Sequence, residues 1–323
     1  MFDLGIPESP LPLQQSPLYH AALTRIGAEA AFVSLPFGPA LVLTRTLPLL
    51  GRVALISRPV WDDPPSLPAL AGLRHSLKAR ALITNAETPG DGAALARAGF
   101  LRLAAPRPVA ELPLSGCPED WLARMGGKWR NRLRHGQRQG LAVSEAALPP
   151  DPQHWLFHKD AAQQATRSYA GLPPKLITAM AVAAPGALRL FTARRGARTV
   201  AAMLFALHGR GATYLIGWSG AEGRAASAHS LLIWQAMGAL ATHGAIRIDL
   251  GLCDGRRSPG LARFKRGSGA VVRDLGGTWG AGGPTVPLHA LLRRLRGLSG
   301  SARARTAPIH PGAARCTGRV EGS

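Results

Sequence analysis

The sequence is poor in cysteine, aromatic residues and lysine. Its three cysteines, Cys117, Cys253 and Cys316, lie far apart among 323 residues, and no CxxC or Cys/His spacing occurs. This excludes a disulfide framework and a zinc motif, so no metal site is expected. Unpaired thiols fit a reducing, cytoplasmic compartment. The aromatic share of only 6% predicts a core that depends on Ala, Leu and Val.

Long apolar runs are also missing. No stretch approaches the roughly 18 uncharged apolar residues that a membrane span needs, so no transmembrane segment is expected. Residues 1–18 are interrupted by prolines and carry acids, with no basic segment followed by an apolar run, which argues against a signal peptide.

Acidic residues are scarce as well, and the formal net charge is +21. The basic residues are 34 Arg against 5 Lys, in a chain rich in Ala, Gly and Pro, a composition typical of GC-rich coding. The charge therefore has two interpretations: a generally basic surface produced by composition, or a functional site for anions.

The order of predicted elements indicates an α/β (α+β) fold with two related units. Both halves show strands, helix, strand, helix and strand, as judged from short β-branched runs and helical spacing. We expect an N-terminal domain over 1–115 and a second domain over 116–280. Residues 281–323 should form a short helix and a disordered basic tail. The glycine-rich stretch 276–283 follows the last predicted strand and opens no helix, so it is not a dinucleotide-binding element.

A strand, a loop of small residues and a helix follow one another over 214–232. Free backbone N–H groups at a helix start bind phosphate well, and Arg224 would reinforce such a site. The candidate cofactor-binding residues are Trp218, Arg224, Ala225, Ala226, Ser227 and Ala228. The alternative is an ordinary helix start capped by Ser227 or Ser230.

The tract 249–269 carries the candidate catalytic residues, Asp249 and Lys265. If the strands around Tyr214 and Ile248 are neighbours that separate, they leave a slot for an extended acyl carrier beside Asp249. An ammonium at Lys265 could stabilise the oxyanion of acyl transfer by a few kcal/mol. Arg263 and Arg266 could bind phosphate. The alternatives are a carboxylate that satisfies loop amides and a solvated basic turn.

A basic helix is expected over 128–139. Arg130, Arg134 and Arg138 recur every four residues and form one stripe. Arg130 and Arg134 are candidate anion-binding residues, for tRNA or an anionic membrane surface. A solvated helix face is the alternative.

Three segments together resemble the FemAB-like branch of the GNAT acyltransferase superfamily, of the "acetyltransferase 6" type. They are Lys128–Gly140, the run Arg224-Ala-Ala-Ser-Ala-His-Ser-Leu-Leu-Ile-Trp, and Asp249-Leu-Gly continuing to Gly260-Leu-Ala-Arg-Phe-Lys-Arg-Gly-Ser-Gly. Ser268 stands where the family usually has an aromatic residue, and the second segment lacks the glycines of the standard GNAT pyrophosphate loop.

The resemblance implies two tandem GNAT-like domains, the first degenerate, with a cleft between them. It implies direct attack of an amine on an acyl donor, with Lys265 matching the lysine that steadies the oxyanion in aminoacyl-transferring members. Three functions stay open. The first is an N-acyltransferase that uses acyl-CoA, such as acetyl-CoA, on a small amine or amino sugar. The second is a tRNA-dependent aminoacyltransferase, and the third is a non-catalytic anion-binding protein on the same scaffold.

Overall fold

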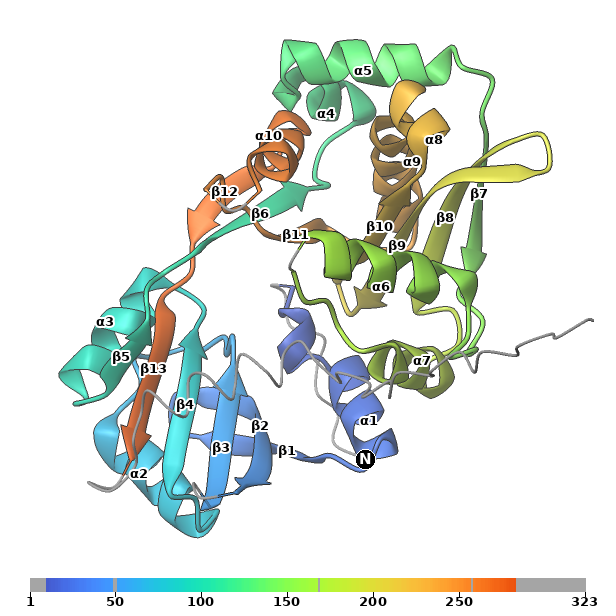
Figure 1. Ribbon diagram of the computed structural model, residues 1–323. Helices are drawn as coiled ribbons and strands as arrows, with labels where there is room; N and C mark the ends of the chain where they lie inside the picture. Colours follow the sequence, from blue (N-terminus) through green and yellow to red (C-terminus); the bar gives the residue numbers. More distant parts are fainter. Residues whose placement is uncertain (1–9, 49–50, 168, 257, 283–323) are drawn as a thin grey trace, which may run out of the picture.

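The structure, a computed structural model, describes residues 10–48, 51–167, 169–256 and 258–282. Two β-sheets, each covered by helices, dominate the fold (Figure 1). The short helix and the basic tail predicted for 281–323 lie outside the described residues, except for Ala281 and Gly282.

The first sheet has six strands in the order β1-β2-β3-β4-β13-β5. Its strands are β1 (Glu29–Leu35), β2 (Gly38–Leu47), β3 (Gly51–Ser57), β4 (Ala81–Ala86), β5 (Leu101–Ala104) and β13 (Gly277–Gly282). The helices α2 (Leu67–Ser76) and α3 (Pro89–Arg97) follow β3 and β4. They pack their apolar residues against this sheet, so that Leu70, Leu95 and Ile56 share one buried cluster.

The second sheet has seven strands in the order β12-β6-β11-β10-β9-β8-β7. Its strands are β6 (Pro108–Pro113), β7 (Ala142–Ala147), β8 (Leu188–Arg195), β9 (Arg198–His208), β10 (Gly211–Ser219), β11 (Arg247–Leu252) and β12 (Val271–Asp274). The accompanying helices are α4 (Pro118–Arg124), α5 (Gly127–Gln137), α6 (Trp155–Arg167), α7 (Pro174–Ala183), α8 (Ala221–Ala225), α9 (Ala228–Thr242) and α10 (Pro259–Gly267).

Both faces of the second sheet are buried, and β9 shows why. Its alternate residues Ala201, Met203 and Phe205 join the cluster under α4, α5 and α9. The residues between them, such as Leu204, join the cluster under α6 and α7 on the opposite face. Because successive side chains of a strand point to opposite faces, a strand covered on both sides is apolar throughout.

The N-terminal segment also contributes to the second core. After the short 3-10 helix η1 (Leu13–Gln15), α1 (Pro17–Arg25) packs beside α7, and Leu18 and Leu23 belong to the same buried cluster as Met180. Ser16 caps α1, with its side chain accepting a hydrogen bond from the Tyr19 backbone.

The two sheets exchange strands across the domain limits predicted at 115 and 280. β6, from the predicted first domain, lies between β11 and β12 in the second sheet. β13, a strand formed by the glycine-rich stretch, returns to the first sheet between β4 and β5. Figure 1 shows β6 running up into the second sheet. The chain later runs down from β12 in that sheet to β13 in the first sheet. Linear boundaries therefore do not separate the two sheets, because pairing partners far apart in the chain are not encoded in local periodicity.

Candidate functional site

The strands β10 and β11 are neighbours only over their first residues. Gly211–Thr213 pairs in parallel with 247–249, and the pairing ends at Asp249. β10 continues along β9 with a register shift between Tyr214 and Ile216, while β11 pairs with β6 on its other side. The two strands are thus neighbours that part beyond Asp249, the arrangement on which the slot considered from the sequence depends.

Side chains satisfy the backbone of β10 beyond this parting. The Gln163 amide of α6 donates to the Gly217 carbonyl at 3.0 Å. The Nε2 of His229, on α9, lies 2.9 Å from the Trp218 carbonyl. Burial lowers the pKa of His229, so the neutral imidazole is favoured at pH 7. Side chains of α6 and α9 therefore contact the β10 backbone beyond the parting.

Lys265 is a buried ammonium at the end of β11. It lies on α10 with only 5% of its surface exposed, and its Nζ donates to the Leu252 carbonyl at 2.8 Å. Burial lowers its pKa to about 8, although Cys253 and Asp249 act in the opposite direction. The other lysines, at positions 78, 128, 159 and 175, are exposed. Lys265 is therefore the only one of the five lysines whose side chain is buried away from water.

Asp249 is bound from two sides. The Arg58 guanidinium lies 2.5 Å from its Oδ2, and the Gly251 backbone N–H donates to its Oδ1 at 2.6 Å. Burial would raise the pKa of Asp249, but the charge and hydrogen bonds of Arg58 hold it below its usual range. Asp249 is therefore an ionised, fully engaged carboxylate, which agrees with the sequence alternative of a loop-binding role.

The Arg58–Asp249 pair belongs to a larger cluster, which we call the ionic junction. Its residues are Arg58, Glu87, Glu111, Arg247, Asp249 and Arg273. Arg58 also binds Glu87, through Nε at 2.6 Å. The junction joins the ends of β3 and β4 in the first sheet to β6, β11 and β12 in the second, with positive and negative groups in equal number.

The start of α9, predicted to bind phosphate, lies under α5. Ser227 occupies the N-cap position with φ 53°, and its side chain makes no capping hydrogen bond. A Cβ on Gly136 would lie 3.2 Å from the Ser227 carbonyl oxygen, so α5 crosses closely over the start of α9. Ala226 and Ala228 are buried, whereas Ala225 is exposed. Arg224 donates to the Ser219 carbonyl at 2.6 Å and thereby holds the loop between β10 and α8.

The basic side chains predicted to bind anions have different surroundings. Arg130 is half-buried and donates to the carbonyls of Leu122 and Met125, where it caps the end of α4. Arg134 is exposed on α5, and Arg263 and Arg266 are exposed on α10. Only these exposed side chains are available to an external anion, and their roles stay predictions.

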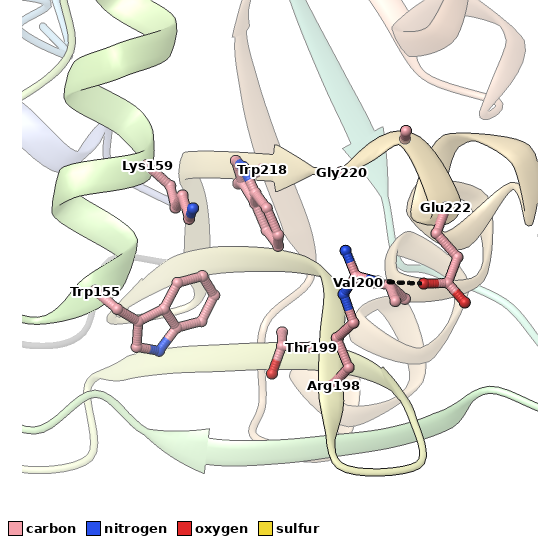
Figure 2. A pocket seen from close by; sticks show the side chains of 9 residues that line it. Trp155, Lys159, Arg198, Thr199, Val200, Trp218, Gly220 and Glu222 are labelled. Carbon is pink, nitrogen blue, oxygen red and sulfur yellow. Dashed lines mark ion pairs between the residues drawn. The ribbon is translucent and has the colours of Figure 1, made fainter.

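A surface pocket of about 580 Å³ opens at the end of β10 and contains Trp218 from the predicted set. We call it the aromatic pocket; it is lined by Trp155, Lys159, Arg198, Thr199, Val200, Trp218, Gly220, Ala221 and Glu222. Figure 2 shows Trp155 and Lys159 coming from one helix to face Trp218, with Arg198 paired to Glu222. The Trp155 and Trp218 rings meet edge to face at 5.7 Å, and the Lys159 ammonium lies 5.5 Å from the Trp218 ring centre.

Sequence reasoning missed Arg58, Trp155, Lys159 and Arg198. Trp155 and Lys159 are four residues apart, so a shared helix face was readable, but its packing beside Trp218 was not. Arg58 carries no local signal, because its partner Asp249 lies 191 residues away. Within the described ranges, no group of three or more His, Cys, Asp or Glu residues could hold a metal ion. No helix in the same ranges is long and apolar enough to cross a bilayer.

Comparison with known proteins supports the resemblance seen in the sequence. Residues 126–266 match the family model described as "Acetyltransferase (GNAT) domain". No curated protein sequence matches the chain.

Solved structures share the fold over most of the chain. FemX superposes with a TM-score of 0.69 at 16% identity, covering 90% of this chain and 96% of that one. The C-terminal domain of a putative lysylphosphatidylglycerol synthetase from Agrobacterium fabrum gives 0.57 at 17% identity, covering 90% and 95%. L-PGS from Bacillus licheniformis gives 0.53 at 12%, covering 90% and 98%. The prediction of a FemAB-like GNAT fold with tandem GNAT-like domains is confirmed.

Proposed function

We propose that this protein transfers an acyl group from acyl-CoA to an amine. The match of residues 126–266 to the GNAT acetyltransferase family model supports this reaction. The amine attacks the thioester carbonyl, a C–N bond forms, and the C–S bond breaks as the tetrahedral intermediate collapses. The proton lost by the amine ends on the departing thiolate or in solvent. The acceptor we propose is a small amine or amino sugar.

The observation that carries this proposal is the buried ammonium of Lys265. Its pKa of about 8 lies above neutral pH, so the charged form is favoured at pH 7. The Leu252 carbonyl engages one of its three N–H groups, and no second partner is seen among the described residues. A fixed cation with free donors in a water-poor site stabilises a developing oxyanion without reorganisation.

The backbone beside Lys265 carries no side chain at position 251. Gly251 has φ 75°, and a Cβ at this position would lie 3.9 Å from Nζ. The absence of a side chain there, next to the parting of β10 and β11, supports approach of an acyl group to the ammonium.

A second donor, aminoacyl-tRNA, is favoured by a specific observation. Ala226 and Ala228 are buried, and one Nη of Arg224 donates to the Ser219 carbonyl, so part of the predicted pyrophosphate site is already engaged within the protein. The exposed arginines of α5 and α10 are suited to RNA phosphates. Donor choice is thus the first question for experiment.

Ligand protection tests the donor. A ligand at about 100 times its Kd stabilises a folded protein by about 2.7 kcal/mol, so millimolar acetyl-CoA should raise the Tm. Because the chain carries a charge of +21, ATP serves as the control for unspecific anion binding. Equal shifts with both ligands, or none with acetyl-CoA, would reject acyl-CoA as donor. Protection by aminoacyl-tRNA beyond that by uncharged tRNA would then support the second donor.

Turnover tests the role of Lys265. We expect Lys265→Ala to lower the rate of acyl transfer to amines at least about 10-fold, because an oxyanion donor is lost. Lys175→Ala, which removes an exposed lysine, is the matched control and should leave the rate unchanged. Full activity in Lys265→Ala would remove Lys265 from the mechanism.

A further inference from the structure

Arg58 connects the first sheet to the end of β11 in the second. It follows β3, and its side chain is 12% exposed. One Nη binds the Asp249 carboxylate at 2.5 Å, while Nε and the other Nη bind Glu87 at 2.6 and 3.0 Å. Its backbone has φ 56°, a left-handed conformation that is uncommon for a residue with a side chain. The guanidinium is thus fixed by two carboxylates from different sheets.

Asp249 passes this constraint to the end of its own strand, where the pairing of β11 with β6 is irregular between Asp249 and Leu252. Its other carboxylate oxygen accepts the Gly251 N–H at 2.6 Å, which fixes the chain where Gly251 adopts φ 75°. The carbonyl of the following residue, Leu252, accepts the hydrogen bond from the Lys265 ammonium at 2.8 Å. Two hydrogen-bonded contacts, joined by the backbone of Gly251 and Leu252, therefore connect Asp249 to Lys265, and Arg58 binds Asp249.

The rest of the ionic junction keeps Arg58 in place. Arg273 binds both Glu87 and Glu111, and Arg247 binds Glu111 at 3.2 Å. Each carboxylate of the junction therefore has an arginine partner, and removal of one member would leave the buried charges of the others less compensated. A planar guanidinium with several N–H donors suits such a position better than a lysine ammonium, which is a single point charge.

We propose that Arg58 is a positioning residue for Lys265, acting through Asp249 and the irregular end of β11 at Gly251. The first domain, which contributes no residue to the predicted catalytic pair, thereby determines where the ammonium stands. The use of the positioned ammonium in acyl transfer rests on the proposed function. The effect of Arg58 on the environment of Lys265 can be measured without any substrate. If Arg58 merely joined the two sheets, its loss would not loosen the backbone at Gly251 and Leu252 that holds the Leu252 carbonyl against Lys265.

The test measures the ionisation of Lys265 by the pH dependence of its reaction with acetic anhydride, followed by mass spectrometry. The four other lysines are exposed and serve as internal references in the same sample. We expect Arg58→Met to raise the pKa of Lys265 by about one unit or more. Removal of Arg58 leaves the Asp249 charge less compensated, and a loosened end of β11 admits water. Both changes favour the charged form of Lys265. A rise from about 8 to 9 lowers the uncharged fraction at pH 8 about fivefold.

Arg52→Met is the matched control, since Arg52 lies on β3 and pairs with Glu29 at the exposed edge of the sheet. It should leave the Lys265 profile unchanged. An unchanged profile in folded Arg58→Met would overturn the proposal. If Arg58→Met does not fold, Arg58→Lys is the second test, because one ammonium cannot hold Glu87 and Asp249 together. A rise in the pKa of Lys265 smaller than that expected for Arg58→Met would support the proposal, and no rise would overturn it.

The labelling result is separable from the proposed function. A raised pKa in Arg58→Met together with full transfer activity in Lys265→Ala would support the positioning role and reject the oxyanion role. An unchanged pKa together with an inactive Lys265→Ala would do the reverse.

Discussion

The aromatic pocket and the ionic junction lie at the ends of neighbouring strands, β10 and β11, and place charge in opposite environments. In the pocket, Arg198 has a side chain that is 80% exposed and pairs with Glu222 at 3.6 Å. In the junction, the Arg58 and Asp249 side chains are 12% and 5% exposed and meet at 2.5 Å. Water screens the first pair and is largely excluded from the second. Breaking an arginine–carboxylate pair therefore destabilises the protein more in the junction than in the pocket. Burial, and not the number of charges, marks the region where the protein can change the ionisation of a side chain.

The largest expected effect separates the two regions directly. Asp249→Ala should lower the free energy of unfolding by roughly 3–5 kcal/mol, because it leaves Arg58 buried without one of its partners. Glu222→Ala removes a carboxylate that also pairs with two arginines but is 31% exposed, and should cost about 0–1 kcal/mol. Urea denaturation measures both variants. Similar losses in the two would show that the buried and exposed pairs do not differ as described.

The pH dependence of the free energy of unfolding should reveal the lowered pKa of Lys265. Its pKa is lowered to about 8 in the folded protein from 10.5, so the unfolded chain binds more protons between these values. Stability contributed by this site therefore rises with pH from about 8 to about 10.5, by about 3 kcal/mol. Lys265→Met should lack this rise, and Lys159→Met, in the aromatic pocket, should retain it. Parallel curves for wild type and Lys265→Met would contradict a desolvated lysine.

A smaller effect tests the wall of the aromatic pocket. A Cβ on Gly223 would lie 2.3 Å from the Val200 carbonyl oxygen, so Gly223→Ala must shift α8 away from β9. We expect a loss of about 1–3 kcal/mol from overpacking. Gly238→Ala is the control: it lies inside α9 with open space around it and should stabilise by about 0.5–1 kcal/mol. Thermal unfolding of both variants should give shifts of opposite sign, and a stabilised Gly223→Ala would show that α8 is not in tight contact with β9.

Local features of the site were predictable because they depend on neighbouring residues. The helix over 128–139 and the strand that ends near Asp249 follow from spacing and glycine punctuation, and the structure has α5 and β11 there. Lys265 stood out because lysine is rare in an arginine-rich chain.

Roles that depend on distant partners were not predictable. Arg130 belongs to a regular basic stripe, yet it caps α4 because the chain turns back at Met125. The glycine-rich stretch had no strand pattern, yet it forms β13 because β4 and β5 leave a gap between them for a strand. A one-dimensional pattern contains no information on such pairings.

The sequence alone determined the α/β character, the separate helices and strands, and the identity of Lys265 and Asp249 as the residues to test. The tertiary structure decided what those two side chains experience. The Arg58–Asp249 contact brings together residues nearly 200 positions apart. The Arg58 charge holds the pKa of Asp249 low, whereas burial lowers the pKa of Lys265. Composition gives the charge of this protein, whereas folding decides which of its charges are removed from solvent.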